Sequence, residues 1–301
     1  LHSTIDLKAK FQGDWFMLLE IDRVQLAVPD AASAVSRWQS ILGAEISAKD
    51  EIACLGASRT SLRLGSGLIE VLEPDGSGLV ADAVASRGAH MFAAGASCTD
   101  IDQLHKSLNV DNIVNEAGQL FINGKDIGIK GLRVVVSQHE ERSQVGKIDF
   151  LYEATLLAQN SGAETARFAE VFSLDAQEFV EIDSPNFGYS GTLTLFRKDL
   201  LHRFEVITPL VPGNTMGRFF TRTGPCLYMA YAETSDILAI EDRVKERGEG
   251  MTLDRPDGRS GSLPADGLWL HPKTLGGMML GLSRPSMAWR WSGHPERVED
   301  I

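Results

Sequence analysis

The sequence is poor in cysteine, in basic residues and in long apolar runs. Its three cysteines, Cys54, Cys98 and Cys226, lack CxxC spacing, so they indicate neither a disulfide framework nor a zinc site and favour a reducing compartment. The net charge of −12 argues against nucleic acid or an anionic membrane as partner, because both require basic patches. No apolar run approaches the roughly 18 residues of a membrane helix, and the N-terminus lacks a signal-sequence pattern. We therefore expect a cytoplasmic protein.

What the sequence does contain is one order of elements, repeated along its 301 residues. In the first copy, the strand-like segment MLLEIDRVQLAV precedes PDAASAVSRWQSILGAE, whose apolar residues have helical spacing and whose Gly43 stands where a C-cap glycine is expected. Short strands are predicted around EIACLG, TSLRLG and LIEVLEP. The second copy, from Arg87 to about Gln138, has the strand RGAHMFAAGASC, the helix TDIDQLHKSLN and the strands QLFIN, DIGI and LRVVVSQ.

The second half of the chain repeats the pattern twice. The third copy is the stretch from Phe150 to Pro209, and the fourth contains the strand CLYMAYAE, the helix TSDILAIEDRVKERG and the strands GLWLH and GGMMLGLS. This agreement predicts an α+β fold, in which four βαβββ modules form two domains with curled mixed sheets around a cavity. The predicted domains are residues 16–140 and 148–285, and residues 286–301 form a tail that packs across a sheet edge or a partner chain.

These segments resemble the vicinal oxygen chelate superfamily, which includes glyoxalase I, methylmalonyl-CoA epimerase, bleomycin-resistance proteins and the two-domain extradiol ring-cleaving dioxygenases. The resemblance is carried by IDRVQLAVPDAASAVSRWQSILGAE, by LIEVLEP, and by ERG with LWLHPKTLGGMMLGL, in which the HPKTLGG turn is the most specific piece. It covers the chain from about Ile21 to Ser283. It implies two glyoxalase-like domains in the dioxygenase arrangement.

Members of that superfamily that bind a metal usually place a His on the first strand of a module and a Glu, Gln or His on its last strand. Carried over to this chain, the paired positions are Arg23 and Glu70, Ala93 and Val135, Glu153 and Glu205, and Met229 and Gly281. The iron ligands of the dioxygenases would fall on Glu153, Met229 and Gly281, of which only Glu153 could bind a hard cation. The resemblance therefore implies that the usual metal site is dismantled.

Arg23 and Glu70 have opposite charge and alternate with apolar neighbours along their strands, so we expect both to face a second cavity, in the N-terminal domain. They could form an anion-binding or proton-transfer site there. We favour an ion pair that fills the space, because an inward charge needs a partner.

Glu153 and Glu205 share a sign, so two carboxylates facing one cavity would repel each other and raise at least one pKa toward the range useful for acid–base chemistry. Arg203 lies two residues before Glu205, hence on the same strand face, and could neutralise one of them or hold an anionic substrate. A purely structural role for the carboxylates stays open.

Three further residues are candidates for substrate contacts. Tyr231 and Met229 share one strand face, although an inward tyrosine is more often simply core. His271, in the HPKTLGG turn, could contact an entering ligand, but shaping the turn beside Pro272 is the favoured role.

The leading hypothesis is an enzyme, an isomerase or lyase that acts on a small organic acid or aromatic metabolite, with Glu153 or Glu205 as the base and Arg203 holding the substrate. No cofactor is expected, although Mg or Mn held by Glu153 and Glu205 is an alternative. Two other functions stay open, a metal-free protein that sequesters a ligand and a metal-dependent dioxygenase with unrecognised ligands. The expected partner is a small molecule, and a homodimer is left open.

Overall fold

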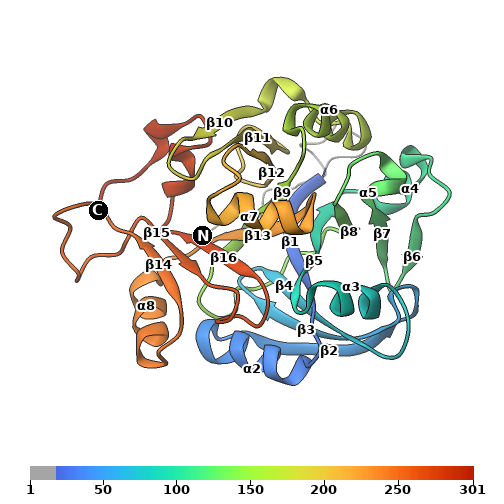
Figure 1. Ribbon diagram of the computed structural model, residues 1–301, viewed down its shortest axis with the longest axis horizontal. Coiled ribbons are helices and arrows are strands. Elements are labelled where there is room, and N and C mark those ends of the chain that lie inside the picture. Colours follow the sequence, from blue (N-terminus) through green and yellow to red (C-terminus); the bar gives the residue numbers. More distant parts are fainter. Residues whose placement is uncertain (1–17) are drawn as a thin grey trace.

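The computed structural model describes residues 18–301 of the chain. Residues 1–17, which include the predicted start of the N-terminal domain at residue 16, lie outside the described residues. Two eight-stranded sheets make up the described part. In Figure 1 the two sheets meet at β1 (Leu18–Ala27) and β9 (Phe150–Leu157) near the centre of the molecule.

The first sheet has the strand order β2-β3-β4-β1-β5-β8-β7-β6. Besides β1, its strands are β2 (Glu45–Ile52), β3 (Ala57–Leu64), β4 (Gly67–Pro74), β5 (His90–Cys98), β6 (Val114–Glu116), β7 (Gln119–Asn123) and β8 (Arg133–Gln138). The helices along this half are α2 (Ala31–Leu42), α3 (Leu79–Arg87), α4 (Ile101–Leu108) and α5 (Gly124–Ile127).

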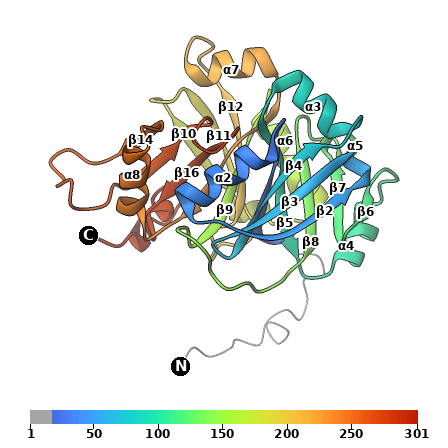
Figure 2. The same ribbon diagram turned by 90° about the horizontal axis from the view of Figure 1, so that it is seen from below.

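The second sheet repeats this order as β10-β11-β12-β9-β13-β16-β15-β14. Besides β9, its strands are β10 (Val180–Ser184), β11 (Tyr189–Leu195), β12 (Arg203–Pro209), β13 (Cys226–Glu233), β14 (Met251–Asp254), β15 (Gly267–Leu270) and β16 (Met279–Ser283). Its helices are α6 (Ser161–Phe172), α7 (Thr215–Thr223) and α8 (Ile237–Glu246). Figure 2 shows α3 and α7, which follow equivalent strands of the two halves, on the same edge of the molecule. The predicted α+β class and its four modules are confirmed.

The helix that opens each half forms for local reasons that the sequence shows. At the start of α2, the side chain of Asp30 accepts a hydrogen bond from the backbone N–H of Ser33, and the helix ends at Gly43, whose φ of 74° suits glycine. Trp38 and the other apolar residues at helical spacing are buried against the sheet. Helix α6 begins in the same way, with Asn160 as N-cap.

Some predicted elements are wrong. The strand expected around EIACLG lies earlier, at Glu45–Ile52, because β2 is an exposed edge strand without apolar alternation. DIGI, expected to be a strand, falls in helix α5 and the loop after it. Three short strands and two helices, β6, β10, β14, α3 and α7, were not predicted at all.

Pairing of the central strands gives each sheet its inner face. Strand β1 pairs in parallel with β4 and antiparallel with β5, and β9 pairs in the same two ways with β12 and β13. Both antiparallel pairs contain register shifts, which increase the local twist of the strands. Alternate side chains of these strands pack on the helices, and the others face inward.

The C-terminal segment packs on its own sheet. Ala288, in the short 3-10 helix Met287–Arg290, is fully buried against Tyr152 and Leu201. No helix within residues 18–301 has the length and apolar character needed to cross a membrane.

Candidate functional site

The inner face of the C-terminal sheet brings most of the predicted site residues together. Glu153 on β9 lies opposite Arg203 on β12 and opposite Tyr231 on β13. Thr155, two residues further along β9, lies opposite Glu205 and Met229 in the same two strands. Two adjacent rows of three inward side chains therefore cross the centre of this sheet.

Arg203 is the cation of this cluster. Its Nε lies 2.7 Å from Glu153 Oε2, its Nη1 donates to the carbonyl oxygen of Leu201 at 2.9 Å, and its guanidinium lies 4.8 Å from the ring centroid of Tyr152. The side chain is 0% exposed, and within the described residues its Nη2 has no hydrogen-bond partner. This buried guanidinium therefore keeps one N–H donor, Nη2, without a partner in the described part of the chain.

Glu205 is the unusual acid. It accepts a hydrogen bond from Thr155 Oγ1 at 2.7 Å and bonds the hydroxyl of Tyr189. Burial, followed by the charge of Glu153, raises the pKa of Glu205 to about 8. Burial also raises the pKa of Glu153, against the opposing charge of Arg203, and the two carboxyl groups hydrogen-bond each other. The carboxyl pair of Glu153 and Glu205 therefore holds a proton at neutral pH.

Aromatic side chains surround the carboxyl pair. Tyr231 stacks on Tyr152 with ring centroids 6.1 Å apart, and its hydroxyl accepts a hydrogen bond of 2.8 Å from Trp269 Nε1. Within the described residues the Tyr231 hydroxyl has no acceptor for its own hydrogen, so this hydroxyl remains a donor. Met229, 5% exposed, lies opposite Thr155 in the second row.

His271 lies away from this cluster. Its Nε2 is 2.9 Å from Thr252 Oγ1, and its backbone N–H donates to the carbonyl oxygen of Gly250. These contacts link two strands at the edge of the sheet.

Sequence reasoning missed three members of the site, Thr155, Tyr189 and Trp269. Thr155 had a signal, because it lies two residues after Glu153 on one strand. Tyr189 and Trp269 come from other strands, and the register that brings them here depends on tertiary structure.

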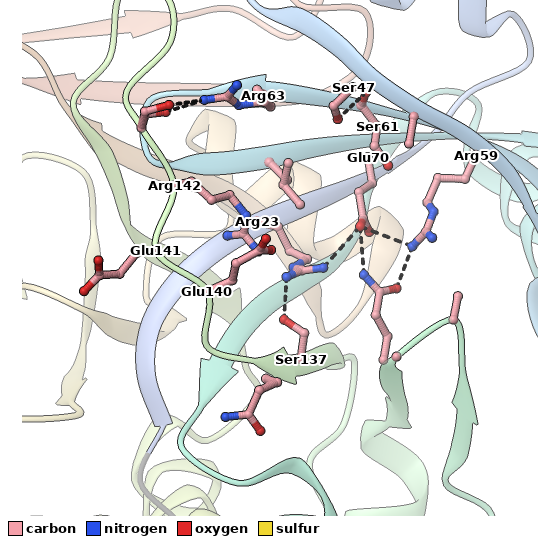
Figure 3. A pocket seen from close by; sticks show the side chains of 17 residues that line it. Arg23, Ser47, Arg59, Ser61, Arg63, Glu70, Ser137, Glu140, Glu141 and Arg142 are labelled. Carbon is pink, nitrogen blue, oxygen red and sulfur yellow. Dashed lines mark hydrogen bonds and ion pairs between the residues drawn. The ribbon is translucent and has the colours of Figure 1, made fainter. Parts of the chain in front are cut away.

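The inner face of the N-terminal sheet has a different charge pattern around a cavity of about 610 Å³. In Figure 3 the guanidinium groups of Arg23 and Arg59 converge on Glu70, with Nη1 atoms 3.3 and 3.2 Å from its Oε1. The amide nitrogens of Gln25 and Gln119 also donate to Glu70, at 2.7 and 2.8 Å. The predicted neighbours Arg23 and Glu70 thus form an ion pair within a larger network.

The arginines of that network have further carboxylate partners. Arg23 Nη2 lies 2.8 Å from Asp22, and Arg59 Nη2 lies 2.5 Å from Asp50. Arg142, at the cavity wall, binds Asp22 at 3.2 Å. The three arginines of the N-terminal network are therefore matched by three carboxylates, Asp22, Asp50 and Glu70.

Comparison with known proteins identifies the fold. No protein-family model and no curated protein matches the sequence. A mutant of 4-hydroxymandelate synthase from Streptomyces coelicolor is 14% identical and superposes with a TM-score of 0.66, covering 94% of this chain and 100% of that one. A xylose isomerase-like TIM barrel/4-hydroxyphenylpyruvate dioxygenase fusion protein is 11% identical, with a TM-score of 0.61. It matches 90% of this chain, which spans 49% of the fusion protein.

The cofactor prediction is contradicted. Because one neighbour with this fold is named as a dioxygenase fusion protein, the fold gives no ground for expecting chemistry without a cofactor. The alternative, Mg or Mn at Glu153 and Glu205, fails on the donor set, because Glu153 Oε2 is bound by Arg203 and Glu205 Oε2 by Thr155. Between residues 18 and 301, no group of three or more His, Cys, Asp or Glu could hold a metal ion. The residues present here do not fit an iron centre either.

Proposed function

Starting from the two-domain vicinal oxygen chelate fold that this chain has, we propose that it is an enzyme that moves protons on a small organic acid or aromatic metabolite, as an isomerase or a lyase. The proposed catalytic residues are Glu153 and Glu205. Arg203 and Tyr231 are the proposed donors to the substrate.

The observation that supports this proposal is the retained proton of the carboxyl pair. A carboxyl group with a pKa near 8 stays protonated at neutral pH and can donate, while its partner carboxylate can accept. Strongly shifted pKa values of this kind are concentrated at functional sites, because ordinary packing rarely retains two acids side by side. Tyr152, which is buried, and Tyr231, which is partly buried, pack beside the pair and offer apolar surface to a small ring or an alkyl chain.

The chemistry balances within the pair. One carboxylate takes a proton from the carbon beside the carbonyl or carboxylate group of the substrate, which breaks that C–H bond and leaves the electron pair delocalised. The other carboxyl group gives its proton to a second carbon in an isomerase, or to the leaving group in a lyase. The pair then holds one proton, as it did before the reaction.

Arg203 has one N–H donor that can bind the substrate anion. Arg203 donates from Nε to Glu153 and from Nη1 to the carbonyl oxygen of Leu201. Its Nη2 therefore remains as the donor for an anionic oxygen. The hydroxyl hydrogen of Tyr231 is a second available donor. Arg203 is fully buried, so substrate binding requires the side chains around it to move.

Deuterium exchange from solvent tests the proposal with simple acids in place of the natural substrate. Pyruvate, acetoacetate and phenylpyruvate are incubated with the enzyme in D₂O, and loss of the C–H signal is followed by proton NMR. We expect exchange of at least one acid above the buffer rate. Glu153→Gln and Glu205→Gln should each slow the exchange by about 100-fold or more.

The matched control is Glu181→Gln, because Glu181 is an exposed carboxylate on β10 of the same sheet. This variant should exchange at the wild-type rate. Unchanged rates in both Glu153→Gln and Glu205→Gln would refute the assignment. Tight binding of the acids by a wild-type protein that exchanges none of them would instead favour a sequestering protein.

A further inference from the structure

The N-terminal domain contains a second, more apolar cavity of about 350 Å³, separate from both clusters described above. Gln25, which lines this cavity, bonds Glu70, which lines the larger one, so the hydrogen-bond network separates the two. Its apolar lining includes Phe92, Phe121 and Leu55. The volume lies at the lower end of the roughly 300–1,000 Å³ typical of ligand pockets.

Arg133, on β8, lines this cavity without a carboxylate partner. No Asp or Glu within residues 18–301 forms an ion pair with it, and its buried Nε has no hydrogen-bond partner there. Its guanidinium packs on the face of Phe92, whose ring centroid lies 4.5 Å from the guanidinium carbon. The inward arginines of the neighbouring network, Arg23 and Arg59, each bind two carboxylates. Arg133 therefore has unused capacity to bind an anion.

Gln25 supplies the second unused polar atom. The residue is 0% exposed, and its Nε2 donates to Glu70 Oε2 at 2.7 Å. That bond fixes the orientation of the amide, because a carboxylate can only accept. The Oε1 atom of Gln25 is buried without a partner among the described residues, although a buried acceptor normally has one.

The two unused atoms belong to residues on one face of the sheet, on strands β1 and β8, which lie on either side of β5. Gln25 on β1 pairs with Ala93 on β5, and the next residue, Ala94, pairs with Val134 on β8, which is adjacent to Arg133. Two strand spacings, about 10 Å, thus separate the backbones of Gln25 and Arg133. Both side chains line the cavity, so one ligand in it can contact both of them.

We propose that this cavity binds a small aromatic carboxylic acid that carries a hydrogen-bond donor at its far end. The carboxylate binds the guanidinium of Arg133, the ring packs on Phe121 and Leu55, and the donor satisfies Gln25 Oε1. A guanidinium matches the planar geometry of a carboxylate, and such charge-assisted bonds are stronger than neutral ones. This site shares no residue with the carboxyl pair of the C-terminal domain, so either proposal can fail alone.

Isothermal titration calorimetry with three probes tests the ligand class on the wild-type protein. The probes are 4-hydroxybenzoate, benzoate and benzamide, the last being a neutral molecule of the same shape as benzoate. We expect 4-hydroxybenzoate to bind more tightly than benzoate, and benzoate to bind about tenfold or more tightly than benzamide, since a charged hydrogen bond contributes about 1.5–3 kcal/mol. Absence of binding by both benzoates at millimolar concentration, or equal affinity for benzoate and benzamide, would overturn the proposal.

Variants assign the site. Arg133→Met should weaken benzoate binding by about tenfold or more, whereas Lys106→Met should leave it within twofold, because Lys106 is an exposed cation on α4 of the same domain. The melting temperature of free Arg133→Met separates a binding role from a structural one. Loss of an unpaired cation should leave the melting temperature unchanged or higher, and a large fall with unchanged benzoate affinity would contradict the assignment.

Discussion

At the scale of single residues, the inner faces of the two sheets neutralise their buried charges in opposite ways. Each sheet places charged side chains at equivalent central positions. In the N-terminal sheet Glu70 meets two arginines, Arg23 and Arg59, and both have further carboxylate partners. In the C-terminal sheet two acids share one arginine, Arg203. The excess acid must keep a proton, because a second buried negative charge would have no partner.

The first prediction concerns the pH dependence of stability. The pKa of Glu205 is raised from 4.5 to about 8 in the folded protein, so between these values the folded state holds a proton that the unfolded state releases. Its contribution to stability is complete below pH 4.5 and is lost as the pH rises through 8, by up to about 1.4 kcal/mol per pH unit. Glu205→Gln cannot ionise, so its stability relative to wild type should rise from pH 5 to pH 8.5.

Urea unfolding at the two pH values measures this difference. The control is Glu181→Gln, an exposed carboxylate on the same sheet, which should show the same difference from wild type at both. A Glu205→Gln variant whose stability relative to wild type does not change with pH would mean that Glu205 is ionised in the folded protein.

At the scale of elements, glycines in the strands let long side chains of neighbouring strands lie across them, because a glycine has no Cβ. A Cβ atom at Gly281 of β16 would lie 2.2 Å from Cε1 of Tyr231, and one at Gly95 of β5 would lie 1.8 Å from Cγ of Arg23. The sequence placed Gly281 only as a position without a metal ligand. The structure explains why this position is glycine: the ring of Tyr231 occupies the space that a side chain would need.

The second prediction follows from this contact. Gly281→Ala should destabilise the protein by about 1–3 kcal/mol, because the methyl group overlaps the ring of Tyr231. In a Tyr231→Ala background most of that cost should disappear, since the overlap is gone. Thermal or urea unfolding of the four proteins in this double-mutant cycle measures the coupling.

Gly213→Ala is the matched control for the glycine change, because nothing lies within 4 Å of a Cβ at Gly213. It should alter stability little. Equal costs for Gly281→Ala with and without Tyr231 would show that the ring is not the cause.

The elements also show what the sequence can and cannot predict. Helix α2 was predictable because its N-cap, apolar spacing and terminal glycine agree. Strand β2 was misplaced because its residues are exposed and polar, so no alternation marks it. Glu153, Glu205 and Arg203 were predicted on one face because strand parity is local, whereas the contacts of Arg133 and Gln25 depend on bulges and register that the sequence does not contain.

At the scale of the whole molecule, the two sheets have one strand order and are joined at their first strands. His202, in the C-terminal half, accepts a hydrogen bond of 3.2 Å from the backbone N–H of Ile21 on β1. Burial lowers the pKa of His202 to about 3, so the ring is neutral at neutral pH and can accept. This bond links the halves through buried atoms.

The third prediction tests that link. His202→Leu leaves the N–H of Ile21 buried without an acceptor, which costs about 1–3 kcal/mol. Because the sheets share this interface, hydrogen exchange measured by mass spectrometry should show β5 and β13 losing protection together. Loss confined to the C-terminal strands would mean that the two halves open independently.

The proposed chemistry depends most on the proton held between Glu153 and Glu205. Carbon-13 NMR of the glutamate side-chain carboxyl groups, followed over pH and assigned with Glu205→Gln, reads the ionisation of Glu205 directly. We expect the carboxyl carbon of Glu205 to titrate with a midpoint near pH 8. A midpoint near the ordinary glutamate value of about 4.3 would contradict this expectation.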